Sequence, residues 1–333
     1  MTPAPRPGRV TVVVASYNHA EYLPRRMESL LAQTYADLEI IVIDDRSPDE
    51  SVAVLRRYES DPRVTLVVRE TNAGWVGVSN QGIAMASGEY VLFANCDDAC
   101  EPRMVERLVD AIQRHPSAGI GFCRSLFVDE HDKVLGEDLD IQEPAFRARC
   151  ATDTLLERRE MSRFLLHACV IPNLSAALFR SESFARVGAL SSDFKACSDW
   201  ELFFRIAREY DVAYVAEPLN LFRQHATTIR SVMKERDTYD EYFTLLLTEA
   251  RTLDLSASER LRARLRVMDL WSTHLIGRSS GGWANFSYHL GRVMRHDPAA
   301  LLMLAPALAR RVVALVGKVL TASRGMLAAG RAQ

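Results

Sequence analysis

The chain has 333 residues, of which 48% are hydrophobic and 25% charged, and this is the composition of an ordinary globular protein. The length allows one large domain or two smaller ones, each with a sizeable core. The formal net charge of −2 and the pI near 6.5 exclude functions that depend on overall positive charge, so we expect no nucleic-acid partner.

The N-terminus and the cysteines point to a reducing compartment. Residues 1–9 are rich in proline and lack the apolar stretch of a signal peptide, so we expect a disordered lead-in. Runs of about 18 uninterrupted apolar residues are absent, so a membrane-spanning helix is not expected. The six cysteines lack C-x-x-C spacing, and Cys96 and Cys100 have poor spacing for zinc; we expect reduced, mostly buried thiols in a cytoplasmic protein.

Short β-branched runs alternate with helical stretches from Val10 onward. This alternation is typical of an α/β fold in which parallel strands are joined by crossover helices. Pro24 fits the first turn of a helix, where its missing N–H costs nothing. We expect strands at 10–15, 38–43, 64–69, 90–94 and 120–123, separated by helices at 21–33, 49–59, 77–86 and 102–115.

Polar clusters follow two of these strands at their C-terminal ends. Asp44 and Asp45 come after strand 38–43, and the stretch 95–98 (Asn-Cys-Asp-Asp) comes after strand 90–94. In open α/β sheets, ligands bind in the crevice outside these ends. We therefore expect the two clusters to share one site, where Asp97 and Asp98 could supply the oxygen ligands that Mg²⁺ or Mn²⁺ prefers.

The second half of the chain is less regular. Residues 125–163 are charged and weakly periodic, which predicts an insertion or a loop-rich flap. After an ordered segment at 174–179, Ser181 offers an N-cap for a short helix, and Asp199 opens another helix. Strands at 212–215 and 219–223 then lead to His225.

A change to long helices after about residue 234 predicts a domain boundary. We expect a domain at 10–233, with halves 10–124 and 125–233, and a helical region at 234–333. From His289 onward, the C-terminal part carries one acid, Asp297, and seven basic residues: Arg292, Arg295, Arg310, Arg311, Lys318, Arg324 and Arg331. This part could lie on an anionic membrane surface. Alternatively, it forms a packing domain or homo-oligomer face, which Pro306 favours because it interrupts the amphipathic run.

Four segments together resemble the family 2 inverting glycosyltransferases of GT-A fold. They occur in family-like order and spacing between about residues 10 and 230: VVVASYNHAEYLPRRMESLLAQTY, LEIIVIDDRSPDES, NAGWVGVSNQGIAMASGEYVLFANCDDACEP and SDWELFFRIA. The resemblance implies a Rossmann-like, nucleotide-binding mixed sheet flanked by helices, with the C-terminal helices as an extension.

The same resemblance implies a nucleobase site at the end of the first strand. Ala15 and Tyr17 would flank the base, and Asp45 would accept a hydrogen bond from its imide N–H. Alternatively, Tyr17 is an ordinary half-buried ring, and Asp45 caps a helix or the turn at 45–48.

Family members usually have Asp-x-Asp where this chain has Asn95-Cys96-Asp97. The resemblance makes Asp97 the first metal ligand, with Asp98 in support and Asn95 near the ribose, and it implies Mn²⁺ or Mg²⁺ as cofactor. The alternative is a pair of solvated turn aspartates. Asn80 is expected at the nucleotide-sugar, although Ser79 stands where a basic residue is common.

Three later residues complete the implied site. Asp199 matches the general base that takes the proton of the acceptor hydroxyl; otherwise it only compensates a helix N-terminus that Ser198 could cap. His225 matches a histidine near the metal or diphosphate, or is a structural residue. Arg223 could contact phosphate.

The resemblance implies transfer of a sugar from a nucleotide-sugar, UDP-linked, to a hydroxyl of a glycan or lipid-linked acceptor in polysaccharide or glycoconjugate synthesis. The alternative is a non-catalytic nucleotide-sugar or glycan-binding module of the same fold. A nucleotidyltransferase or a dinucleotide-dependent oxidoreductase is disfavoured, because the segment after strand 10–15 lacks a glycine-rich phosphate loop.

Overall fold

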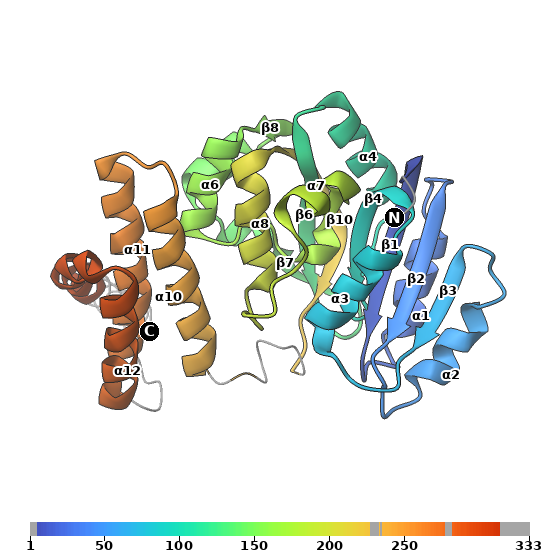
Figure 1. The fold of residues 1–333 in the computed structure, drawn as a ribbon, viewed down its shortest axis with the longest axis horizontal. Helices are drawn as coiled ribbons and strands as arrows, with labels where there is room; N and C mark the ends of the chain where they lie inside the picture. Colours follow the sequence, from blue (N-terminus) through green and yellow to red (C-terminus); the bar gives the residue numbers. More distant parts are fainter. Residues whose placement is uncertain (1–4, 227–232, 234, 277–281, 314–333) are drawn as a thin grey trace, which may run out of the picture. The chain divides into compact units, whose positions relative to one another are not determined.

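The computed structural model describes residues 5–226, 233, 235–276 and 282–313 (Figure 1). The chain divides into two compact units, residues 1–232 and 233–333. In the described residues, the first unit contains a ten-stranded mixed sheet flanked by helices and the second is helical, so the α/β class and the C-terminal helices are confirmed.

The central sheet has the strand order β3-β2-β1-β4-β9-β6-β10-β5, with β7 paired to β6 and β8 paired to β10. The bounds are β1 (Arg6–Ser16), β2 (Leu38–Asp44), β3 (Val64–Val68), β4 (Gly88–Asn95), β5 (Ala99–Cys100), β6 (Ala118–Val128), β7 (Val134–Glu137), β8 (Thr154–Leu156), β9 (Ala177–Arg180) and β10 (Asp211–Arg223). Strands β3, β2, β1 and β4 are parallel, as the sequence predicts, and β9 runs antiparallel to both β4 and β6.

The first strands and helices form where the hydrophobic pattern predicts them. The helices of this half are α1 (Leu23–Leu31), α2 (Ser51–Leu55) with the 3₁₀ turn η1 (Arg56–Tyr58), α3 (Gly74–Met85) and α4 (Met104–Arg114). Pro24 lies in the first turn of α1. Because side chains alternate along a strand, Val12 and Val14 of β1 belong to the core that includes α1, while Val13 faces α3.

The region 125–163 is not the loop-rich flap that its charge suggested. Strand β6 continues to Val128, followed by β7, the 3₁₀ turn η2 (Asp138–Ile141), α5 (Pro144–Arg149), β8 and α6 (Arg158–His167). Charged residues here pair with each other, as in the contact between Arg149 and Glu160 at 2.9 Å. Pairing of β8 with β10 and packing of α6 on α8 (Ser198–Glu209) attach the region to the sheet.

Two further expectations differ from the structure. Residues 212–223 form one strand, β10, whose register shifts on both sides of Pro218, because proline cannot donate a ladder hydrogen bond. The 3₁₀ turn η3 (Leu174–Ala176) and β9 precede α7 (Ser181–Val187). Ser181 does not cap α7 as expected, because its hydroxyl donates to the carbonyl oxygen of Gly88. The six cysteines, all within the described residues, are free thiols, and five are buried.

The second unit consists of α10 (Glu235–Thr252), α11 (Ala257–Ile276), α12 (Gly282–His296) and the 3₁₀ turn η4 (Pro298–Met303). Phe243, Trp271 and Val293 are fully buried in it, and Arg264 pairs with the buried Asp297 at 2.7 Å. Of the seven basic residues noted above, Lys318, Arg324 and Arg331 lie outside the described residues. Across the described helices, none combines the length and apolarity that crossing a membrane requires.

Helix α3 lies close against β1 because residue 82 is glycine. A Cβ added at Gly82 would come within 2.2 Å of Val13 Cγ1, and overpacking of this kind costs about 1–3 kcal/mol. We expect Gly82→Ala to lower the free energy of unfolding by this amount in urea denaturation. Gly136→Ala is the control, since a Cβ there has no neighbour within 4 Å among the described residues. Equal midpoints for the two variants would contradict the close approach of α3.

Candidate functional site

The C-terminal ends of β1, β2 and β4 lie side by side at one edge of the sheet. In the parallel register, Ser16 is paired with Asp44, and Ala15 is paired with both Ile43 and Asn95. The structure therefore brings together the two polar clusters that the sequence assigned to one site.

Asp44, not Asp45, holds the turn after β2. Its buried carboxylate accepts hydrogen bonds from the Ser47 N–H at 2.8 Å and the Ser47 hydroxyl at 2.6 Å, and from the Ser16 hydroxyl at 3.1 Å. The expected alternative, in which Asp45 caps this turn, is therefore wrong. Asn18 donates from its backbone to Ser47 Oγ at 3.0 Å, which ties the loop after β1 to the same turn.

Asp45 is buried at the N-terminus of α3. Its carboxylate accepts hydrogen bonds from the N–H groups of Ala73 and Gly74, each at 2.8 Å, and pairs with Arg69 Nε at 3.1 Å. A carboxylate is well placed there, because helix N-termini present unpaired N–H groups and partial positive charge. Asp45 thus fixes the start of α3, and its contact with a nucleobase remains a prediction.

Tyr17 follows β1 directly and is 46% exposed, which is compatible with the half-buried ring expected as the alternative and also leaves part of the ring accessible. Its neighbour Asn18 has a positive φ of 55°, as does Arg46 (63°) in the turn after β2. Non-glycine residues adopt this conformation rarely, and such residues cluster at functional sites. The exposed ring is available for stacking, although stacking on a base stays a prediction.

Asp98 is buried at the centre of the polar cluster. It accepts hydrogen bonds from Asn173 Nδ2 at 2.7 Å, from the backbone N–H of Arg223 at 3.0 Å and from Asn95 Nδ2 at 3.3 Å. Burial and the neighbouring charge of Asp97 raise the pKa of Asp98 to about 7. Its carboxylate therefore joins segments of the fold, and a supporting role toward a metal is still a prediction.

The amide of Asn95 has a physical reason in this setting. A carboxylate at position 95 would add a second negative charge beside the buried Asp98, whereas the amide donates a hydrogen bond to it. Arg26 Nε donates to the backbone oxygen of Asn95 at 2.8 Å and fixes the end of β4.

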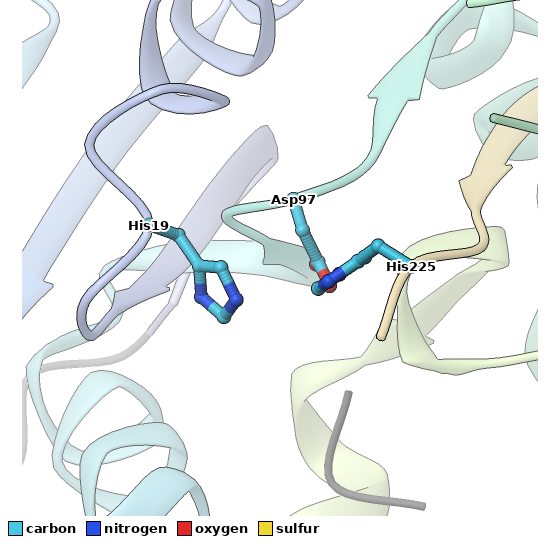
Figure 2. Close-up of side chains that lie close together, drawn as sticks. All are labelled: His19, Asp97 and His225. Carbon is cyan, nitrogen blue, oxygen red and sulfur yellow. The ribbon is translucent and has the colours of Figure 1, made fainter. Parts of the chain in front are cut away.

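Asp97 lies within a cluster of possible metal ligands. One ligand atom from each of His19, Asp97 and His225 lies within 4.8 Å of the others, and Figure 2 shows the three side chains converging from three separate loops. His225 Nε2 is 2.9 Å from Asp97 Oδ2. Burial tends to raise the pKa of Asp97, but the hydrogen bond with His225 and the charges of both histidines outweigh it and lower that pKa.

The sequence predicted Asp97 and His225 for this cluster but missed His19. The available signal was its place three residues after the end of β1, at the same edge of the sheet as Asp97. Two imidazoles and one carboxylate form a donor set that suits a divalent transition metal.

Arg223 has a buried side chain whose three nitrogens face protein oxygens. Nε donates to the Asp97 backbone oxygen at 2.7 Å, and the other two contact the Asp129 carbonyl and the Asp132 carboxylate. Arg223 thus fastens the loop 95–98 to the turn 129–132, while its predicted contact with phosphate has no direct support from this arrangement.

Asn80 connects α3 to the segment before Asp199. Its amide donates to the Leu190 carbonyl at 2.9 Å and accepts from the Leu190 N–H at 3.0 Å. Trp75, on the same helix, donates from Nε1 to the Lys195 carbonyl at 3.0 Å. These three hydrogen bonds place the segment 190–195 on α3, so Asn80 has a structural role besides its predicted contact with nucleotide-sugar.

Asp199 is half-buried in the first turn of α8, where its Oδ1 accepts a hydrogen bond from the Trp200 N–H at 2.8 Å. Ser198 donates to the Ser191 carbonyl at 2.8 Å instead of capping the helix. The compensation of helix charge expected as an alternative is thus compatible with the structure, and the role of Asp199 as a base remains a prediction.

Comparisons with known proteins agree on one family. A family model described as glycosyl transferase family 2 matches residues 11–187. An uncharacterized glycosyltransferase of Haemophilus influenzae is 25% identical over 75% of this chain and 82% of its own length. An uncharacterized glycosyltransferase of Nostoc sp. is 34% identical over 39% of this chain and 40% of its own length. Glycosyltransferase GlyG of Streptococcus pneumoniae is 33% identical over 41% of this chain and 48% of its own length. These two matches thus span less than half of each relative.

Solved structures show the same fold. S. aureus TarS in complex with UDP-GlcNAc superposes with a TM-score of 0.67 at 16% identity, covering 89% of this chain and 84% of that one. The mannosyltransferase PcManGT from Pyrobaculum calidifontis, in complex with GDP-Man and Mn²⁺, gives 0.52 at 18% identity, covering 94% and 87%. At these identities the likeness concerns the fold, and it confirms the expected GT-A architecture.

Loss of the Asn80 amide should release the segment before Asp199. We expect Asn80→Ala to reduce the hydrogen-exchange protection of residues 189–197 by about 1–2 kcal/mol, since each hydrogen bond contributes about 0.5–1.5 kcal/mol. Asn80→Asp keeps the acceptor for the Leu190 N–H but loses the donor, so its effect should be smaller. Gln81→Ala, which alters the neighbouring side chain, serves as the control. Unchanged protection in Asn80→Ala would refute this link.

Proposed function

The chain belongs to glycosyl transferase family 2, whose members are inverting glycosyltransferases of GT-A fold, and from this premise we propose its donor, acceptor class and mechanism. The donor is a nucleotide-sugar, UDP-linked, and the acceptor is a hydroxyl of a glycan or lipid-linked molecule in polysaccharide or glycoconjugate synthesis. One observation carries the proposal: the loops after β1, β2 and β4, with Tyr17, Asp45 and Asp97, lie at the same end of the sheet, and His225 contacts Asp97 there.

The donor would lie along this edge. The accessible part of the Tyr17 ring offers a surface for stacking a base. The buried Asp45 carboxylate, which accepts from the N–H groups of Ala73 and Gly74, would accept an imide N–H in addition. Ala15 and Asn95, paired in the sheet, would lie between the base and the diphosphate. A UDP donor is favoured by the likeness to TarS, which was solved with UDP-GlcNAc, whereas PcManGT was solved with GDP-Man.

The diphosphate end requires positive charge. Asp97, with His225, would hold a divalent cation, Mn²⁺ or Mg²⁺, which supplies charge neutralisation of the leaving diphosphate when bound. Asp98 would hold Asp97 in place through the loop that both share. The hydrogen bond from Asn95 to Asp98 accounts for the missing first acid, so this departure from the family pattern does not favour the alternative of a non-catalytic module.

Transfer would follow from a single displacement. Asp199 would accept the proton of the acceptor hydroxyl while the hydroxyl oxygen attacks the anomeric carbon, and the bond to the diphosphate breaks on the opposite face. Attack from the opposite face inverts the anomeric configuration. The contacts of α3 with segment 190–195 would hold Asp199 for this task.

The cellular setting is proposed on the sequence alone. We place the enzyme in the cytoplasm, with the basic C-terminal helices available for peripheral membrane contact or for self-association. Four basic residues of this region, Arg292, Arg295, Arg310 and Arg311, lie within the described helical residues.

Binding and chemistry should separate at Asp199. After a screen of UDP- and GDP-sugars by thermal shift with Mn²⁺ has identified a donor, product formation is followed by mass spectrometry. We expect Asp199→Asn to keep the donor-induced shift and to reduce transfer by about 10²–10⁴-fold, since it removes general-base catalysis. Asp193→Asn, an exposed acid of the same segment, should behave like the wild type. Full transfer activity in Asp199→Asn would exclude this mechanism.

The donor-induced stabilisation should depend on a cation held by Asp97. We expect EDTA to abolish the donor-dependent thermal shift and added Mn²⁺ to restore it in the wild type. Asp97→Ala should show little donor-dependent shift with or without Mn²⁺, whereas Asp140→Ala, which removes an exposed acid elsewhere, should respond like the wild type. A donor shift that is insensitive to EDTA would rule out a cation requirement for donor binding.

A further inference from the structure

Three segments contribute to the cluster around Asp97, and the loop after β1 contributes His19. Asp97 follows β4, His225 follows β10, and His19 follows β1 in the stretch Ser16-Tyr17-Asn18-His19. The rings of His19 and His225 have centroids 5.2 Å apart and are nearly perpendicular, at 83°. Figure 2 shows both rings directed toward the Asp97 carboxylate.

We infer that His19 is a third protein ligand of the cation and that the resulting two-histidine, one-carboxylate set selects Mn²⁺ over Mg²⁺. The inference deepens the proposed function and rests on it for the purpose of the cation. It stands on the geometry of the cluster, in which the three ligand atoms lie within 4.8 Å of one another, a spread that one ion can bridge.

The chemistry of the donor set decides which cation it prefers. Mg²⁺ favours oxygen ligands and keeps several of its waters, whereas imidazole nitrogen suits divalent transition metals, and among them iron, nickel, copper and zinc most. In this chain position 95 offers an amide that is engaged with Asp98, and the loop after β1 offers an imidazole. Nitrogen therefore outnumbers carboxylate in the cluster.

A second contact orients the His19 ring. Its Nδ1 lies 3.6 Å from Cys96 Sγ, and Cys96 precedes Asp97 in the same loop. In the tautomer that carries its proton on Nδ1, this group would donate to the sulfur, and Nε2 would hold the lone pair that a metal ligand needs. Metal-binding histidines commonly donate their other ring N–H to a neighbouring acceptor in this way.

The position of His19 also couples the cation to the other end of the donor site. Tyr17 and Asn18 lie between β1 and His19, and the Asn18 N–H is bonded to Ser47 Oγ at 3.0 Å in the turn after β2. Coordination by His19 would fix this loop at both ends. Cation binding would then order the segment that carries the stacking ring of Tyr17 before the sugar donor arrives.

The test measures cation binding by the full chain without any donor. Calorimetry should show that the wild type binds Mn²⁺ more tightly than Mg²⁺. It should also show that His19→Ala weakens Mn²⁺ binding by at least about 10-fold, because even the loss of a residue that only supports a ligand costs about 10–100-fold. Its effect on Mg²⁺ should be smaller. His115→Ala, which removes a histidine at the C-terminal end of α4, should bind both cations like the wild type.

Pulsed electron paramagnetic resonance of bound Mn²⁺ gives an independent readout, because it detects coordinated nitrogen. We expect two coordinated imidazoles in the wild type and in His115→Ala, and one in His19→Asn, a smaller polar replacement that guards against misfolding in His19→Ala. A wild-type spectrum with one imidazole or none, or unchanged Mn²⁺ affinity in both His19 variants, would overturn the inference.

These outcomes separate the inference from the function on which it builds. If the cation data are as expected but no nucleotide-sugar is bound or transferred, the proposed function fails and the His19 site stands. If sugar transfer requires Mn²⁺ but the His19 variants bind it like the wild type, the function stands and His19 is not a ligand.

Discussion

The buried carboxylate of Asp98 joins the two strand ends on which the candidate site depends. It accepts the backbone N–H of Arg223 at the end of β10 and the amide of Asn173 before β9, while its own loop follows β4. Arg223 completes the connection by donating to the backbone oxygen of Asp97. Asp97 and His225 follow strands β4 and β10, which are not neighbours in the sheet. These bonds therefore hold the two loops together.

Burying this carboxylate costs free energy, and the surrounding residues supply hydrogen bonds and positive charge that offset the cost. Burial and the charge of Asp97 raise the pKa of Asp98, while the buried Arg26 lowers it and also bonds to the end of β4 and to Ser175 Oγ at 3.1 Å. An amide at position 95 adds a donor where an acid would add repulsion. The departure from Asp-x-Asp is therefore consistent with a cluster that relies on histidines for its remaining ligands.

Local patterns predicted the parts of the site that strands alone determine. Asp44, Asp45 and Asp97 follow apolar runs whose parallel pairing fixes where their C-terminal ends lie, so sequence reasoning placed them together correctly. It misjudged residues 125–163, because charges that pair in the fold, such as Arg149 of α5 with Glu160 of α6, look like solvated charges in the sequence. It missed the partner of Asn80, because Leu190 lies 110 residues further along the chain and local periodicity carries no signal for such a contact. It also missed His19, because its place three residues after β1 does not by itself show that it meets Asp97 and His225.

Helix α3 links the proposed donor side of the site to the segment that carries Asp199, the proposed general base. Its N-terminus is held by Asp45, at the end of β2, while Trp75 and Asn80 along its length hold the segment 190–195 that leads into α8 and Asp199. The absence of a side chain at Gly82 lets the same helix lie directly on β1, and the loop that follows β1 carries Tyr17 and His19. A displacement of α3 would thus shift both the loop that carries Tyr17 and the segment that carries Asp199. In the proposed reaction, the rigid packing of this one helix on the sheet would keep the donor and acceptor groups correctly oriented during transfer.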